Sequence, residues 1–257
     1  MIEAKKSFGQ NFLKDKNIID KIVNSIDVTD QDLIIEIGPG QGALTKKLKS
    51  KNATLLAFEI DERMKEVLAP LEDKKTKVIY KDILTVDLKE ILSNYNYNKV
   101  YVIANLPYYI TSPIIEKLVS LNYIDEMTLM VQNEVADRFC AKPSTKDYGM
   151  MTVLLNVSYD VNKLFIVKNT CFTPVPKVDS AVINLKKKTN VTVLNNMDGF
   201  KKFISLAFMH KRKTLRNNIG NELFSKVESI SNVITPNTRA EELSVDTYIE
   251  ICNKLYK

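Results

Sequence analysis

The sequence predicts an α/β fold with a mainly parallel sheet, followed by a small all-helical C-terminal domain. Between residues 33 and 141, short buried-strand patterns alternate with helical patterns, which is typical of a parallel sheet. A cluster of glycines ends the first of these strands, and after about residue 190 only helical periodicity remains. We therefore expect two domains, residues 1–186 and 190–257, joined by a lysine-rich connection at residues 186–190.

The expected elements follow one another along the chain. A helix at residues 17–26 carries isoleucines and a valine on one face. The expected strands cover residues 33–37, 54–58, 77–80, 100–104 and 127–131, and the helices that accompany them cover residues 43–48, 61–71, 87–92, 114–119 and 134–141. Residues 150–161 fit a helix or a strand, and residues 178–185 alternate like a late strand that could pair antiparallel. The C-terminal helices are expected at residues 200–210, 215–223 and 245–255.

Length and composition exclude several classes of protein. With 257 residues, 45% of them hydrophobic, the chain has enough apolar side chains for a packed core. No apolar stretch approaches the roughly 18 residues of a membrane span, and residues 1–6 lack the apolar part of a secretion signal, so we expect a cytoplasmic protein. Three distant cysteines and one histidine, His210, argue against zinc sites, disulfide frameworks and histidine-based hydrolysis. No metal is expected.

Positive charge is concentrated late in the chain. Residues 180–220 hold nine basic residues against one acid, Asp198, which gives a net charge of +8 while the rest of the chain carries −2. The basic residues are Lys186, Lys187, Lys188, Lys201, Lys202, Lys211, Arg212, Lys213 and Arg216. Such a cluster indicates a polyanion partner, for example a nucleic acid, although a solvated lysine-rich face would give the same count.

A glycine-rich turn follows the strand expected at residues 33–37. Glycine at Gly38, Gly40 and Gly42 lets the backbone turn tightly and lets a ligand approach the main chain. Glu59 ends the next strand, 21 positions after Gly38, where a carboxylate can accept hydrogen bonds from both hydroxyls of a ribose. The spacing of Gly38, Gly40 and Ala43 also matches the dinucleotide fingerprint. A nicotinamide cofactor, S-adenosylmethionine and a purely structural turn therefore remain open at this point.

The segment Asn105-Leu106-Pro107-Tyr108 favours S-adenosylmethionine and an adenine substrate. It follows the fourth strand, so it should lie at the ligand-binding edge of the sheet. An adenine amine is a poor nucleophile because its lone pair is delocalised into the ring. A site that methylates it should accept both N–H bonds, and the Asn105 side-chain oxygen and a carbonyl of the Leu106-Pro107 turn are suitable acceptors. Tyr108 offers a ring for an extruded base, although the segment could simply cap a strand.

Nine short segments, which follow one another over residues 8–217, are similar to segments of one protein family. They are Phe8-Gly9-Gln10-Asn11-Phe12-Leu13, residues 36–40, 59–61, 82–84 and 105–108, Gln132 with residues 134–136, and residues 146–149, 172–180 and 212–217. Each segment alone is weakly specific, but all of them in this order are highly specific. Together they resemble the ribosomal RNA adenine-N6 dimethyltransferases, the KsgA-type enzymes.

The resemblance implies a Rossmann-like, S-adenosylmethionine-dependent methyltransferase. It implies that the cofactor contacts Asn11, Leu13, Gly38, Gly40, Glu59, Asp82 and Asn105. The implied catalytic residues are Asn105, Leu106, Pro107, Tyr108 and Phe172, with Phe172 as a second stacking face opposite Tyr108. The expected RNA-binding residues are Lys211, Arg212, Lys213 and Arg216. Taken alone, Asn11 could also cap a helix, Asp82 could cap a loop and Phe172 could serve packing only.

The implied activity is dimethylation of N6 on two adjacent adenines in the 3′-terminal hairpin loop of small-subunit (16S) ribosomal RNA. The implied partner is this RNA or an immature small ribosomal subunit, and the enzyme is expected to be a monomer with a role in subunit biogenesis. Ala104, Lys81 and Asn133 depart from the family pattern, and only Asn133 is expected to weaken an RNA contact.

Parts of this pattern are also compatible with three other functions. A large-subunit ribosomal RNA methylase of the antibiotic-resistance type shares the catalytic core, but Leu106 and residues 172–174 and 212–214 argue against this type. A non-catalytic RNA-binding assembly or transcription factor would not need Asn105, Tyr108 and Glu59 together. Binding of S-adenosylmethionine rather than a nicotinamide cofactor would exclude an oxidoreductase.

Overall fold

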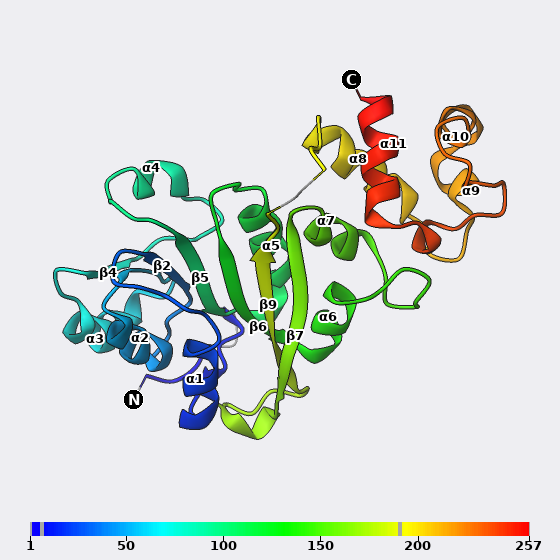
Figure 1. Cartoon of the computed structure of the whole chain (residues 1–257). Helices are drawn as coiled ribbons and strands as arrows, with labels where there is room; N and C mark the ends of the chain where they lie inside the picture. Colours follow the sequence, from blue (N-terminus) through cyan, green and yellow to red (C-terminus); the bar gives the residue numbers. More distant parts are fainter. Residues whose placement is uncertain (1, 6–7, 190–191, 257) are drawn as a thin grey trace. The chain divides into compact units, whose positions relative to one another are not determined.

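A seven-stranded sheet with the strand order β4-β3-β2-β5-β6-β9-β7 forms the centre of the computed structural model, which describes residues 2–5, 8–189 and 192–256 (Figure 1). The strands are β2 (Leu33–Ile37), β3 (Thr54–Phe58), β4 (Thr76–Ile79), β5 (Val100–Asn105), β6 (Glu126–Gln132), β7 (Tyr159–Val167) and β9 (Ser180–Lys187). Strands β4, β3, β2, β5 and β6 pair in parallel, whereas β9 runs antiparallel to β6. The predicted α/β fold with a mainly parallel sheet is confirmed.

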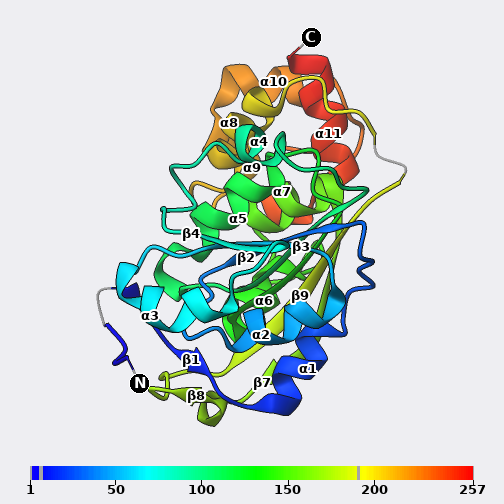
Figure 2. The ribbon, with the colours of Figure 1, turned by 90° about the vertical axis from the view of Figure 1, so that its left-hand side faces the viewer.

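Helices cover both faces of the parallel part of the sheet (Figure 2). On one side lie α1 (Lys16–Val23), α2 (Ala43–Leu48) and α3 (Lys65–Leu68), and on the other side lie α4 (Leu88–Leu92) and α5 (Thr111–Val119). Because both faces are covered, β2 is buried along its whole length, and β5 is buried in all but its last residue. None of the described helices is both long enough and apolar enough to cross a lipid bilayer.

Several expected elements have different bounds in the structure. The helix expected at residues 61–71 is reduced to the single turn of α3 between two 3₁₀ turns, and Pro70, which has no N–H to donate, lies in the second of these turns. The ambiguous residues 150–161 divide into α7 (Met150–Ser158) and the start of β7. The helix expected at residues 215–223 is interrupted by Gly220, whose φ of +82° ends α9 (Leu215–Ile219) before α10 (Asn221–Glu228) begins.

The chain forms two compact units. The first contains residues up to 136 together with residues 162–187, and the second contains residues 137–161 and 188 onward. The sequence analysis assigned residues 137–161 to the first domain. In the structure this segment is bound to the C-terminal helices, since the Tyr148 hydroxyl donates to the Leu243 carbonyl (3.0 Å) and the Ser144 N–H donates to the Glu241 carbonyl (2.7 Å).

Three further helices are α6 (Asn133–Phe139), α8 (Met197–Ala207) and α11 (Val245–Leu255). The boundary between the two units falls within α6, and α8 and α11 belong to the second unit. Aromatic rings contribute to the core of the second unit, where Phe203 packs against Tyr248 with ring centroids 6.1 Å apart. The expected domain start at residue 190 lies outside the described residues.

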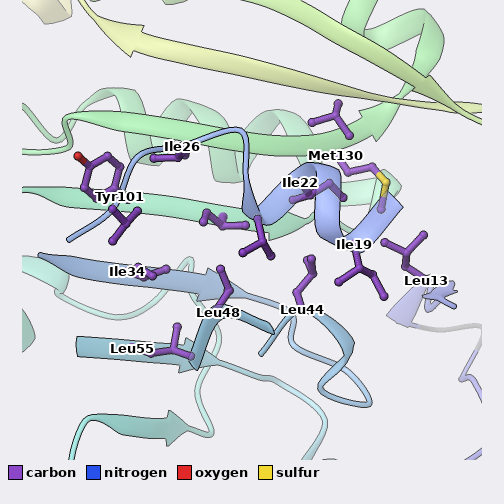
Figure 3. Close-up of a cluster of buried hydrophobic side chains, with 14 of the residues drawn as sticks. Leu13, Ile19, Ile22, Ile26, Ile34, Leu44, Leu48, Leu55, Tyr101 and Met130 are labelled. Carbon is purple, nitrogen blue, oxygen red and sulfur yellow. The ribbon is translucent and has the colours of Figure 1, made fainter. Parts of the chain in front are cut away.

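A hydrophobic cluster joins α1 and α2 to the sheet (Figure 3). Its labelled members in the figure are Leu13, Ile19, Ile22, Ile26, Ile34, Leu44, Leu48, Leu55, Tyr101 and Met130. The isoleucine face of α1 supplies Ile19 and Ile22, and Ile26, which was predicted on the same face, lies just beyond the end of the helix. Leu13 belongs to the segment before α1, so the cluster also fixes this N-terminal segment onto the sheet.

A second, two-stranded sheet pairs β1 (Phe12–Leu13) with β8 (Phe172–Thr173) in antiparallel orientation. Leu13 lies opposite Phe172, and the Lys14 N–H donates to the Cys171 carbonyl at 3.0 Å. The Phe172 side chain is fully buried in the same hydrophobic cluster as Leu13. The expectation that Phe172 offers an open stacking face is therefore wrong in this structure, because its ring is used for packing.

This packing role predicts the effect of Phe172→Ala. Removing a fully buried phenylalanine should lower the free energy of unfolding by about 3–5 kcal/mol, since the cavity that remains cannot be filled. Chemical denaturation of the wild type and the variant measures this difference. Phe172→Leu keeps most of the volume and should lose much less. An unchanged denaturation midpoint in Phe172→Ala would contradict the packing role.

Candidate active site

A cleft of about 1440 Å³ opens at the carboxyl ends of the parallel strands, within the first unit. Its walls come from the turns after β2, β3, β4 and β5, from the N-terminal segment, and from Thr173 and Pro174. Open α/β sheets bind ligands at this edge, where strand order changes direction. The cleft is larger than the roughly 300–1,000 Å³ of typical ligand pockets, so it has room for more than one small group.

The cleft brings together all of the expected cofactor-binding and catalytic residues except one. Those that line it are Asn11, Leu13, Gly38, Gly40, Glu59, Asp82, Asn105, Leu106, Pro107 and Tyr108. Phe172 is not among them. The four basic residues Lys211, Arg212, Lys213 and Arg216 belong to the second unit, where all four are exposed.

The glycine turn forms one wall of the cleft. The Gly38 N–H donates to the Phe58 carbonyl (2.9 Å), which ties the end of β2 to the end of β3. Gly40 has a φ of +54°, and a Cβ at this position would lie 3.0 Å from the ring carbons of Phe12. The positive φ favours glycine at position 40, and the Phe12 ring packs where a side chain would begin. Both Gly38 and Gly40 line the cleft.

Glu59 links this turn to the strand beside it. Its side chain is 4% exposed, and its two carboxylate oxygens accept hydrogen bonds from the N–H groups of Gly40 (3.0 Å) and Asp61 (2.9 Å). Burial raises the pKa of this carboxyl, and the two backbone N–H groups oppose that effect. A carboxylate has about four lone-pair positions, so Glu59 can still accept hydrogen bonds from a ligand in the cleft.

Asp82 lines the cleft and also caps the loop in which it lies. One of its oxygens accepts a hydrogen bond from the Leu84 N–H at 2.9 Å, as the loop-cap alternative predicted. The loop itself is held by Lys117 of α5, whose ammonium donates to the carbonyls of Leu84 (3.0 Å) and Val86 (2.6 Å). The second Asp82 oxygen has no hydrogen-bond partner in the part of the chain that the structure describes, so it can accept from a ligand. Sequence analysis missed Lys117, because nothing in its local pattern indicates a contact some 30 positions away.

Asn105 is fixed by a hydrogen bond to the N-terminal segment. One of its side-chain N–H bonds donates to the Asn11 carbonyl at 3.1 Å, and among the described residues the amide oxygen has no partner, so it is left as an acceptor. The Pro107 carbonyl accepts from the Ile110 N–H (3.3 Å) and the Thr111 hydroxyl (3.0 Å). The Leu106 carbonyl is thus the acceptor of this turn that remains for a ligand.

Tyr108 presents a ring with a fixed orientation. Its hydroxyl is hydrogen-bonded at 2.6 Å to the hydroxyl of Ser180, a fully buried residue at the start of β9. Burial raises the pKa of Tyr108, so the phenol stays neutral under ordinary conditions. The contact between Tyr108 and Ser180 could not be predicted from the sequence, because it joins residues 72 positions apart.

The N-terminal segment closes another side of the cleft. The Asn11 side chain donates to the Gly9 carbonyl (3.2 Å), and the cap of α1 is Asp15, so Asn11 does not cap a helix. Gln10 donates to Asp61 at 2.8 Å, and the Arg63 guanidinium, which also binds Asp61, lowers the pKa of that carboxyl to about 2. Gln10 and Asp61 were not expected to meet, since their pairing joins two distant motifs.

Glu36 is a buried acid beneath this site. It is 1% exposed, and among the described residues its carboxyl oxygens make no hydrogen bond of normal geometry. Burial is the main cause that raises its pKa to about 8; the hydroxyl and N–H of the neighbouring Thr45 oppose this effect, and the nearby charge of Glu59 adds to it. Glu36 is therefore protonated at neutral pH.

Known proteins resemble this chain along nearly its whole length. A family model described as "Ribosomal RNA adenine dimethylase" matches residues 1–257. The "Ribosomal RNA small subunit methyltransferase A" of Caldanaerobacter subterraneus subsp. tengcongensis is 41% identical over 263 residues, covering 99% of this chain and 98% of that protein. A dimethyladenosine transferase from Plasmodium falciparum has a crystal structure with a TM-score of 0.78 at 25% identity, covering 95% of this chain and 97% of that chain. The 23S rRNA methyltransferase ErmE shares the fold, with a TM-score of 0.68 at 21% identity over 96% of this chain and 100% of that one.

The buried Glu36 predicts a pH-dependent stability. The folded protein keeps this proton up to about pH 8, whereas the unfolded chain releases it near pH 4.5. Because the folded state binds more protons between these values, the free energy of unfolding should fall as pH rises through this range. Glu36→Gln removes this component, so its stability relative to the wild type should increase from pH 5 to pH 8. Urea denaturation at several pH values, with the exposed Glu66→Gln as control, measures the trend, and a constant difference would contradict it.

Proposed function

Because the chain belongs to the ribosomal RNA adenine dimethylase family, we propose that it dimethylates N6 of two adjacent adenines in the 3′-terminal hairpin loop of small-subunit ribosomal RNA. The chain is an enzyme of the S-adenosylmethionine-dependent type. The observation that carries the proposal is the fixed amide of Asn105, whose oxygen is left as an acceptor in the same cleft as Glu59 and Asp82.

The residues of the cleft fit S-adenosylmethionine. Gly38 and Gly40 line the cleft with positive φ angles and carry no side chain, so a ligand can approach the main chain of the turn. We assign the ribose hydroxyls to Glu59 and the adenine amine of the cofactor to Asp82, because carboxylates accept the hydrogen bonds that these groups donate. Asn11, Leu13 and Gly38 complete the binding surface. When bound, the cofactor supplies a methyl group on positively charged sulfur.

The segment at the end of β5 suits the adenine that is to be methylated. The Asn105 oxygen and the Leu106 carbonyl can accept both N–H bonds of its amine, which draws the nitrogen toward a tetrahedral geometry. Pro107 sets the turn that presents these two acceptors, and the ring of Tyr108, held through Ser180, can stack on the base. No histidine is needed, since the proton can leave after the nitrogen has become cationic.

The exposed basic residues of the second unit suit the RNA backbone. Lys211, Arg212, Lys213 and Arg216 carry four positive charges over six positions. Among the described residues, only Arg216 of these four has a side-chain hydrogen bond, which it donates to the Asn221 oxygen at 2.8 Å. Charges that are free of acidic partners can neutralise phosphates and release their counterions. We further propose a cytoplasmic monomer that acts on an immature small subunit.

The proposed function is tested by mass spectrometry of ribosomal RNA from cells with and without this gene. Loss of the gene should abolish dimethyladenosine in the 3′ fragment of small-subunit RNA, and the plasmid-borne gene should restore it. An unchanged level of dimethyladenosine in that fragment would overturn the proposal. A change confined to large-subunit RNA would instead indicate the other substrate class.

Asn105→Ala should separate catalysis from cofactor binding. Loss of the acceptor should lower kcat by about 100-fold or more, whereas the Kd for S-adenosylmethionine should change by less than about 5-fold. Single-turnover kinetics and calorimetry give the two quantities. Asn105→Asp keeps acceptor oxygens but loses the donor to Asn11, so it should retain more activity than the alanine variant. Equal losses of kcat and cofactor affinity in Asn105→Ala would show that Asn105 serves binding only.

Removing positive charge from the second unit should weaken RNA binding in a salt-dependent way. In a triple alanine variant at Lys211, Arg212 and Lys213, the slope of log affinity against log salt concentration should become less negative by about 2. Each phosphate contact contributes about 0.7 to this slope for single-stranded RNA. Binding to small-subunit RNA across a salt series measures the slope. Lys226→Ala with Lys254→Ala is the control, because both lysines are paired with glutamates in the same unit. A slope equal to that of the wild type would contradict the role.

A further inference from the structure

Tyr109, next to Tyr108, has a ring that the fold leaves open. Tyr109 lines the cleft and is 56% exposed, and among the described residues no other tyrosine or phenylalanine is as exposed. Tyr108, in contrast, is partly buried and bound to Ser180 through its hydroxyl. Two adjacent tyrosines therefore differ in environment, one held within the cleft and one at its border with solvent.

The Tyr109 ring rests on the backbone of the N-terminal segment. A Cβ added to Gly9 would lie 3.0 Å from Cδ1 and 3.3 Å from Cε1 of Tyr109, so the ring packs closely over this glycine, whose φ of +58° also favours a residue without a side chain. The Gly9 carbonyl accepts from the Asn11 side chain, and the Asn11 carbonyl accepts from Asn105. Two hydrogen bonds thus connect the support of the Tyr109 ring to the amide that we assign to the target base.

The hydroxyl of Tyr109 also has no protein partner. Within the part of the chain that the structure describes, Tyr109 makes no hydrogen bond, ion pair or ring contact, and much of its side chain lies in solvent. Packing on Gly9 would not need an aromatic ring, since an aliphatic side chain can cover a glycine equally well. The ring is therefore available to a ligand that lies outside the cleft.

We infer that Tyr109 is a stacking face for the nucleotide next to the target adenine. This inference rests on the proposed function. When a base is drawn out of a strand into a pocket, its neighbour loses a stacking partner, and an exposed ring at the mouth of the pocket can take that place. Stacking of this kind accepts any base, so Tyr109 contributes affinity for single-stranded RNA rather than choice of sequence.

The test compares substitutions that keep or remove the aromatic ring. Tyr109→Leu keeps an apolar side chain against Gly9 but has no flat ring, whereas Tyr109→Phe and Tyr109→Trp keep one. With small ribosomal subunits that lack dimethyladenosine as substrate, Tyr109→Leu should raise KM for the subunits about 10-fold. Tyr109→Phe and Tyr109→Trp should stay within about twofold of the wild type. Tyr97→Leu, a tyrosine outside the cleft, is the matched control.

Two further measurements separate stacking from a merely structural role. The Kd for S-adenosylmethionine and the Tm of Tyr109→Leu should match those of the wild type. A KM for subunits that is unchanged in Tyr109→Leu would overturn the inference, as would a parallel loss of cofactor affinity and Tm, which would assign the ring to packing. A wild-type enzyme that does not methylate the subunits would instead overturn the proposed function itself.

Discussion

The hydrogen bond from the Asn105 side chain to the Asn11 carbonyl is the contact on which the cleft depends. It joins residues 94 positions apart and connects the carboxyl end of β5 to the segment that covers the opposite wall. By engaging the amide nitrogen, it also determines that the amide oxygen is the free acceptor. This one hydrogen bond connects two walls of the cleft, and it also leaves the Asn105 amide oxygen, an acceptor, to meet the substrate amine. The β1–β8 pair supports the bond, because it holds Leu13 just beyond Asn11.

The acidic groups around the cleft differ in their electrostatic environment. Asp61 is neutralised by Arg63, and its pKa is lowered to about 2. Glu59 is bound only by backbone N–H groups among the described residues, and its pKa is raised by burial. A buried carboxylate without a cation partner is costly in an empty site, and a ligand with positive charge offsets that cost. The chemical character of a sulfonium cofactor suits this arrangement.

Much of the fold and of the site could be predicted from sequence, because the relevant signals are local. Buried strand patterns predicted β2, β3 and β5, and glycines with a carboxylate after the next strand predicted the turn beside Glu59. Long-range contacts carry no local signal. The buried state of Phe172 depends on its pairing with Leu13, and the grouping of residues 137–161 with the C-terminal helices depends on contacts such as that of Tyr148 with Leu243. The family pattern pointed to Phe172, but only the tertiary structure shows where its ring lies.

The pairing of β1 with β8 also concerns the order in which the chain is made. A ribosome that has synthesised the first 130 residues has already produced the glycine turn, Glu59, Asp82 and Asn105. The strand that pairs with β1 does not yet exist at that stage, since it consists of Phe172 and Thr173. In the nascent chain, β1 therefore has no strand to pair with until the residues of β8 have left the exit tunnel. Capture of a ligand in a fully walled cleft is consequently a late event in the biosynthesis of this protein.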